Sequence, residues 1–161
     1  MSDLTIEAYI DGSCWPNPNG VGRIGVFAPK QDNWKKALLY SGYIGKGWGL
    51  SNNVVEYAAA IAALQLLSKY KNIKIHSDSK MLVLQMSGSR GYSDGMYIPF
   101  MNMLKQKVKS FELIKFIWIP RKVNVIADSL SKNTSTDYCE DEILKDLRQV
   151  WKNGLNCSVD C

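Results

Sequence analysis

Four acidic residues stand apart from the polar stretches of the sequence. Asp11 and Asp78 each follow a short apolar run. Glu56 lies in the opening turn of a predicted helix, and Asp128 lies in a segment with helical character. Carboxylates without an accompanying histidine or thiolate suit hard cations such as Mg²⁺ or Mn²⁺ better than zinc or copper. One such acid is best explained as a partner for a helix dipole. Four of them indicate a metal site.

These acids converge only if strands and helices bring them to one edge of a sheet. The first half predicts strands at 4–10, 23–28 and 36–44, paired as an antiparallel meander. A helix is expected over 53–70, with Ser51, Asn52 or Asn53 as its cap. Strand ends and helix starts meet at one edge of a parallel or mixed sheet, so Asp11, Glu56 and Asp78 are expected to lie together.

The second half alternates strands with helices. Strands are predicted at 73–76 and 113–119, helices at 79–86 and 98–109, and one or two helical turns at 124–132. This alternation predicts parallel pairing and an α/β fold.

A C-terminal extension is expected after the first domain, which spans 1–133. Within 134–161, apolar residues recur with the spacing of an amphipathic helix at Ile143, Leu144, Leu147, Val150 and Trp151. We expect this helix to pack on the body of the protein.

Composition and local sequence patterns exclude several classes of protein. The 161 residues are 46% apolar and 22% charged, which is typical of one globular domain. No apolar run approaches the roughly 20 residues of a membrane span, so no membrane partner is expected. The N-terminus lacks the features of a secretory signal, which predicts a cytoplasmic protein with free thiols. A zinc site could in principle include His76, Cys139, Cys157 and Cys161, but the spacing of these residues matches no common zinc finger.

Four segments carry the acids in sequence order: YIDGSCWPNPNG, SNNVVEYAAAIAAL, IHSDSKMLV and WIPRKVNVIADSLSK. They resemble the four signature blocks of type 1 ribonuclease H. The resemblance implies a mixed five-stranded sheet in the order 3-2-1-4-5, flanked by helices. It also implies an endonuclease that cleaves the RNA strand of RNA/DNA hybrids, leaving 5′-phosphate and 3′-hydroxyl ends. Two Mg²⁺ ions, with Mn²⁺ as a substitute, would be held by Asp11, Glu56, Asp78 and Asp128.

The same resemblance implies substrate contacts around the metals. Asparagine side chains can hydrogen-bond the ribose 2′-hydroxyl that distinguishes RNA from DNA, although turn and cap formation are alternative roles. Lys80 stands where the family more often has Gln, and it reaches either a phosphate or solvent. The implied substrate-binding residues are Gly12, Ser13, Cys14, Asn17, Ser51, Asn52, Asn53, Ser79, Lys80 and Asn124.

Two departures from the family pattern concern turnover and binding. The loop 121–125 lacks the histidine that many members have there, and 87–95 is a short loop where some relatives insert a basic helix. The net charge of +5 is concentrated between 104 and 122, so Lys105, Lys107 and Lys109 are candidates for phosphate contact or form a solvated helix face.

Two alternatives to a ribonuclease H remain open. One is a catalytically idle module of the same fold that binds nucleic acid or protein, which the complete set of acids argues against. The other is a different nuclease of the superfamily, such as a junction resolvase or exonuclease. The expected enzyme acts as a monomer without an obligate protein partner.

Overall fold

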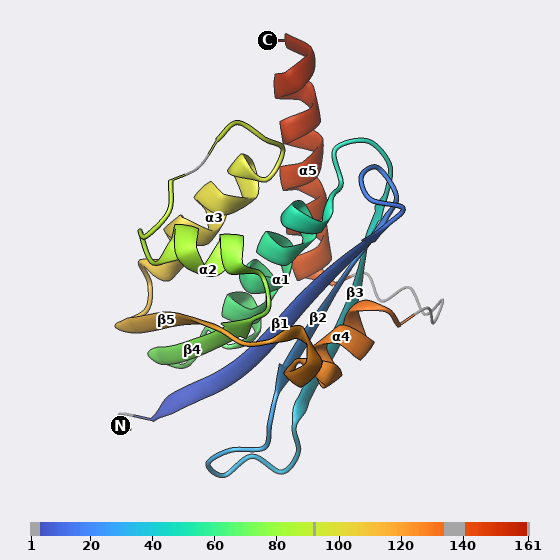
Figure 1. Cartoon of the computed structure of the whole chain (residues 1–161). Coiled ribbons are helices and arrows are strands. Elements are labelled where there is room, and N and C mark those ends of the chain that lie inside the picture. Colours follow the sequence, from blue (N-terminus) through green and yellow to red (C-terminus); the bar gives the residue numbers. More distant parts are fainter. Residues whose placement is uncertain (1–3, 92, 134–140, 161) are drawn as a thin grey trace.

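A five-stranded mixed sheet in the order β3-β2-β1-β4-β5 forms the centre of the computed structural model, which describes residues 4–91, 93–133 and 141–160, with side chains up to Leu155 (Figure 1). β1 (Thr5–Trp15), β2 (Val21–Ala28) and β3 (Leu38–Lys46) pair antiparallel. β4 (Asn72–Ser77) and β5 (Leu113–Trp118) continue the sheet in parallel with β1. The predicted fold class, strand order and meander are confirmed.

Helices cover both faces of this sheet. α1 (Asn52–Leu66) packs on one face, together with α2 (Lys80–Met86), α3 (Ile98–Val108) and α5 (Glu142–Asp160). The other face carries α4 (Val125–Ser131), which follows the short 3₁₀ turn η1 (Arg121–Val123) and lies over β1, β2 and β3. Figure 1 shows α4 in front of the sheet and α1 behind it.

α1 is the central helix of the core. Every residue from Val54 to Leu64 is buried, and alanines make up much of this run. Small side chains let the helix lie close to the sheet, where alternate residues of β1 such as Ile6 and Ile10 are fully buried. Glu56 is carried into this interior because it belongs to the buried part of the helix.

β1 is longer than predicted, because it continues to Trp15 rather than ending at Ile10. Antiparallel pairing with β2 extends as far as Trp15 and Val21, which overrides the turn-like composition of the segment. Gly12 lets this part of β1 lie against α1, since a Cβ atom there would lie 2.5 Å from the backbone carbon of Val55. Asp11 therefore lies inside a strand and not at its end.

α1 is shorter than predicted and ends at Leu66 instead of residue 70. The Leu67 N–H still donates to Ala63 O, and the Tyr70 N–H then donates to Leu67 O as the chain turns toward β4. The sequence carries no glycine or proline that would mark this end. The other predicted strands and helices of residues 1–133 all begin and end within two residues of the predicted positions.

α5 packs on β3, which is an edge strand of the sheet. Leu144 and Leu147 are buried in the main core. Arg148 donates through Nε to Ile44 O at 3.1 Å and through Nη2 to Tyr43 O at 2.8 Å. The helix thus packs on β3 and α3, and contains the predicted apolar stripe. Whether 1–133 is a domain by itself stays a prediction, and the boundary after Asn133 lies outside the described residues.

No helix in the described part of the chain has the length and apolar character of a membrane span. His76 lies on β4 with its Nε2 atom 3.1 Å from Glu7 Oε1. Cys139, Cys161 and the side chain of Cys157 lie outside the described residues. The structure therefore gives no distances among the four residues of the considered zinc site.

Gly12→Ala tests the close approach of β1 to α1. We expect the free energy of unfolding in urea to fall by about 1–3 kcal/mol, because the new methyl group overlaps the backbone of α1. Gly91→Ala is the matched control, since nothing lies within 4 Å of a Cβ atom there. Equal stability of the two variants would contradict this account of the β1–α1 contact.

Candidate active site

Three carboxylates meet where the pairing of β1 with β4 ends. The last paired residues are Ile10 and Ser77, and Asp11 and Asp78 each follow one of them. Glu56 approaches from α1, one turn beyond the Ser51 cap rather than in the first turn as predicted. One oxygen from each of the three carboxylates lies within 4.8 Å of the others. The predicted convergence of Asp11, Glu56 and Asp78 is therefore observed.

Burial makes this group electrostatically unfavourable without a cation. Asp11 and Glu56 are only 5% and 8% exposed. Burial, with a smaller contribution from the charge of Asp78, raises the pKa of Asp11 to about 6. Burial and then the neighbouring charge of Asp11 raise the pKa of Glu56 well above its usual value. Three ionised carboxylates at this spacing repel one another unless positive charge is added.

Two carboxylate oxygens of this group lack hydrogen-bond partners, which also fits a metal site. Glu56 Oε2 and Asp78 Oδ2 are buried and have no hydrogen-bond partner among the described residues. An unpartnered buried carboxylate oxygen is costly, whereas hard cations take such oxygens as ligands. Burial also raises the pKa of Asp78, while Asn124 and Arg121 oppose this shift. The donor set therefore fits a hard divalent cation.

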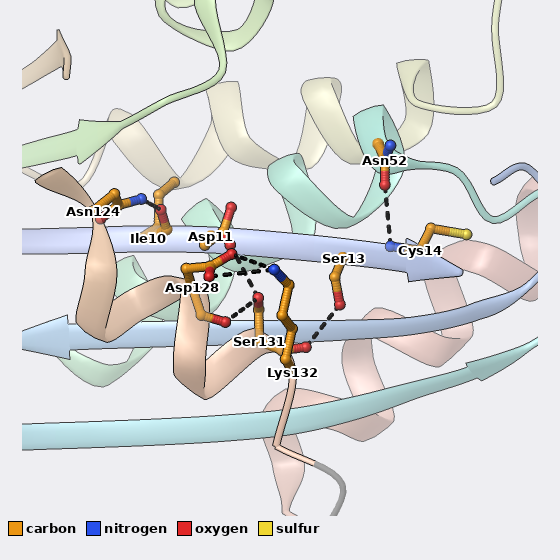
Figure 2. A network of polar contacts seen from close by, with 9 residues as sticks. All are labelled: Ile10, Asp11, Ser13, Cys14, Asn52, Asn124, Asp128, Ser131 and Lys132. Carbon is orange, nitrogen blue, oxygen red and sulfur yellow. Dashed lines mark hydrogen bonds and ion pairs between the residues drawn. The ribbon is translucent and has the colours of Figure 1, made fainter. Parts of the chain in front are cut away.

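Asp128 lies beside this group but not in it. Its carboxylate pairs with Lys132 one helical turn later, with 3.0 Å between Lys132 Nζ and Asp128 Oδ1. Ser131 links the two places, because its Oγ lies 3.0 Å from Asp11 Oδ2 and 2.8 Å from the Asp128 carbonyl oxygen (Figure 2). α4 thus brings a fourth acid to the site together with its own counter-ion.

The cleft above the carboxylates has a volume of about 840 Å³. Most of the residues predicted from the sequence line it: Asp11, Gly12, Ser13, Cys14, Asn17, Asn52, Asn53, Glu56, Asp78 and Ser79. The chain after β1 and the start of α1 form its walls. A cleft of this size holds one stretch of an extended ligand rather than a single small molecule.

Two asparagines connect these walls. The Cys14 N–H donates to Asn52 Oδ1 at 3.1 Å, and the Asn52 N–H donates to Asn17 Oδ1 at 2.9 Å. The Asn52 side-chain oxygen therefore joins the end of β1 to the start of α1 (Figure 2). The Asn17 oxygen joins the turn after β1 to the same helix start. Ser51 is the helix cap, with its hydroxyl oxygen accepting from the Val54 N–H. Asn52 and Asn53 are the first residues of the helix.

Some predicted site residues do not line the cleft. Asn124 is buried behind it and donates through Nδ2 to Ile10 O at 2.8 Å, which ties α4 to β1 beside Asp11. Lys80 Nζ lies 4.9 Å from the ring centroid of Trp118, at the edge of the sheet. Ser51 and Asp128 also lie outside the lining.

The cleft contains positively charged side chains that were not predicted as site residues from the sequence. Arg23, Arg121 and Lys132 line it, together with Trp15 and Val21. Arg121 belongs to the basic segment noted in the sequence, but Arg23 carries no local signal because strand pairing alone brings it there. Lys105, Lys107 and Lys109 belong to α3 and its C-terminal end and do not line the cleft.

Comparison with known proteins indicates the family of this chain. The model of the "Reverse transcriptase-like" family matches residues 22–134. "Ribonuclease HI" of Xylella fastidiosa is 40% identical over 76 residues, and "Ribonuclease H" of Actinobacillus succinogenes is 42% identical over 77. These matches cover 47% and 48% of this chain and 46% of each relative. The matched region thus spans about half the length of these curated relatives.

Solved structures extend the comparison to most of the chain. RNase H1 from Halobacterium salinarum superposes with a TM-score of 0.70 at 25% identity, covering 79% of this chain and 94% of that one. LC11-RNase H1, solved in complex with an RNA/DNA hybrid, gives a TM-score of 0.61 at 29% identity, covering 78% and 92%. The resemblance to type 1 ribonuclease H is confirmed. The chain belongs to the reverse transcriptase-like family, in which its sequence relatives and structural neighbours are ribonucleases H.

Proposed function

We propose that this protein is an endonuclease that hydrolyses the RNA strand of RNA/DNA hybrids and leaves 5′-phosphate and 3′-hydroxyl ends. One observation carries the proposal: buried carboxylates with unpartnered oxygens lie together at a cleft that also contains arginine, lysine and asparagine side chains. The solved complex of LC11-RNase H1 with a hybrid supports the choice of substrate.

Asp11, Glu56, Asp78 and Asp128 would hold two Mg²⁺ ions, or Mn²⁺ in their place. When bound, such ions polarise the scissile phosphate and lower the pKa of the attacking water. Ser131 orients the Asp11 carboxylate by the contact between its Oγ and Asp11 Oδ2. The oxygen of the attacking water bonds to phosphorus, and the bond between phosphorus and the 3′ oxygen breaks. The 3′ oxygen takes up a proton and leaves as a hydroxyl group, while the phosphate stays on the 5′ end of the downstream fragment.

Substrate binding follows from the cations and amides of the cleft. Arg23 and Arg121 face the phosphates, which sets the position of the nucleic acid without reading its sequence. Asn17 and Asn52 use their side-chain oxygens internally, so their NH₂ groups are the donors left for a ribose 2′-hydroxyl. Recognition of RNA thus depends on side chains already held in place by β1 and α1.

Asp78→Asn removes one carboxylate charge with nearly unchanged shape. We expect hybrid cleavage in Mg²⁺ to fall by more than about 100-fold, as is typical when one electrostatic stabiliser of a reaction is lost, while hybrid binding persists. The control is Asp32→Asn, an exposed residue with φ of 52° that asparagine tolerates. Activity of Asp78→Asn within tenfold of the control would refute the proposed metal role.

Asp11→Asn tests the electrostatic cost of the metal-free site. Folded Asp11 keeps its proton up to about pH 6, whereas its ordinary pKa is 3.8, so wild-type stability should fall as pH rises between these values and stay low above them. From about pH 4 to about pH 7.5 in EDTA, the variant should gain about 2–3 kcal/mol relative to wild type. Urea unfolding measures this gain, and Mg²⁺ at the higher pH should stabilise wild type more than the variant. A pH-independent difference would show that Asp11 is not penalised by folding.

Asn52→Ala tests recognition of the 2′-hydroxyl. A single 2′-deoxy substitution in the RNA strand at the cleaved position should slow wild-type cleavage by about tenfold, the usual effect of one lost hydrogen bond. The same substitution should change the rate of the variant little, because its donor is already absent. Equal effects of the deoxy substrate on both proteins would assign Asn52 to holding Cys14 alone.

A further inference from the structure

The sheet face that carries α4 continues beyond the end of this helix. Ser13 Oγ donates to Ser131 O at 2.7 Å, so Ser13 points toward α4 (Figure 2). Side chains alternate along a strand, so Trp15 points to the same face two residues later. Trp15 is 81% exposed. The last residue of β1 therefore presents an aromatic side chain to solvent just past α4.

Strand pairing places a cation beside the ring of Tyr43. Arg23 on β2 pairs with Ser13 on β1 and with Tyr43 on β3. Its guanidinium carbon lies 5.1 Å from the centroid of the Tyr43 ring, and its Nη1 donates to Asn133 O at 2.8 Å. The ring and the carbonyl group together hold the guanidinium in one place. Arg23 is thus a fixed cation on the face that carries Trp15.

A second cation ends this surface at β3. Val21 pairs with Trp15 on one side and with Lys46 on the other. A Cβ atom on Gly45 would lie 2.5 Å from Cζ3 of Trp151 on α5, so Lys46, the next residue along the strand, faces the opposite side. Lys46 is exposed. We call the residues of this area the sheet-end surface: Trp15, Val21, Arg23, Tyr43 and Lys46.

The sheet-end surface continues the active-site cleft. Trp15, Val21 and Arg23 also line the cleft that contains the carboxylates. No acidic side chain belongs to the surface, and no ion pair in the described part of the chain involves Lys46. Its positive charges therefore attract an anionic chain that leaves the cleft on this side.

We propose that the sheet-end surface binds unpaired RNA that continues from the hybrid held in the cleft. One base stacks on the exposed ring of Trp15, and Arg23 and Lys46 contact the phosphates on either side. Aromatic side chains with neighbouring cations on an open sheet face are suited to single strands, because every base has a face that can stack. This contact rests on the proposed nuclease function, since the strand that continues from the carboxylates is the RNA strand that is cut.

Unpaired RNA suits this surface better than a protein segment does. Trp15 is mostly exposed, whereas Val21 and Tyr43 are half-buried. The anchor residues of a protein interface lie in well-packed apolar pockets, and one ring beside two cations does not form such a pocket. A nucleotide needs only a ring face and a cation. Hybrids that border a single strand are therefore the expected preferred substrates.

Fluorescence anisotropy in EDTA, which prevents metal-dependent cleavage, measures the binding of labelled hybrids to the full chain. One hybrid is blunt, and the others carry about four unpaired nucleotides at the 5′ or the 3′ end of the RNA strand, the lower end of the range that single-strand binding surfaces cover. We expect one of these overhangs to lower the dissociation constant by about tenfold, as stacking of one base would. The same overhang without its bases should lose most of this gain, since it keeps only the phosphates.

Variants of the full chain locate the contact. Trp15→Ala should reduce the gain from the overhang to about threefold or less, because the stacking face is lost. Lys46→Glu should reduce it as well, since attraction for a phosphate becomes repulsion. The gain is a ratio measured within each protein, so a change in binding of the blunt hybrid cancels.

Matched controls remove a similar exposed side chain elsewhere. Leu39 is exposed at the other end of β3, and Lys30 is exposed just beyond the other end of β2. Leu39→Ala and Lys30→Glu should both keep the full gain from the overhang. Thermal unfolding of each variant checks that the fold is retained.

The outcomes separate this proposal from the nuclease proposal. If blunt hybrid is cut in Mg²⁺ but neither overhang improves binding, the nuclease stands and a protein partner becomes the explanation of the exposed Trp15. An equal gain from the overhang without bases, or an undiminished gain in Trp15→Ala, would also overturn the single-strand contact. If blunt hybrid is neither bound nor cut, the nuclease proposal fails and the single-strand contact fails with it.

Discussion

The contact between β1 and α1 is the constraint on which the site depends. Gly12 lies against the backbone of Val55 with no room for a side chain. This approach carries Asp11 and Glu56 into the same buried place from elements that are distant in sequence. A larger separation would hydrate both carboxylates and relieve their repulsion, but it would also separate the ligand atoms. The packing density of the core is therefore also the condition for a compact metal site.

Burial of like charges makes the metal-free site a source of instability. The pKa values of Asp11, Glu56 and Asp78 are all raised, in each case first by burial. The cost is borne by the rest of the core, where a fully buried central helix and sheet supply the apolar contacts. A cation that binds only the folded state would return part of this free energy, so binding of such a cation would be coupled to folding.

The C-terminal half of the chain completes the site and the sheet in different ways. α4 brings Asp128, Ser131 and Lys132 to Asp11, and buried Asn124 ties its start to β1. α5 instead protects the edge strand β3, where the Arg148 guanidinium donates to two of its carbonyl oxygens. An edge strand with free carbonyl groups invites pairing with other chains, and these hydrogen bonds occupy two of those groups.

The sequence by itself determined the fold class, the order of the elements and the three acids that converge. Strand and helix patterns are local, and the acids followed from their positions at element boundaries and from the spacing of four blocks. Only the tertiary structure decided that β1 continues to Trp15, that α1 ends at Leu66, and that Arg23 lines the cleft. Each of these depends on pairing or packing with a distant segment, which outweighs local propensity. The counter-ion of Asp128 and the sheet-end surface also depend on which side chains meet in space, and a linear pattern does not contain that information.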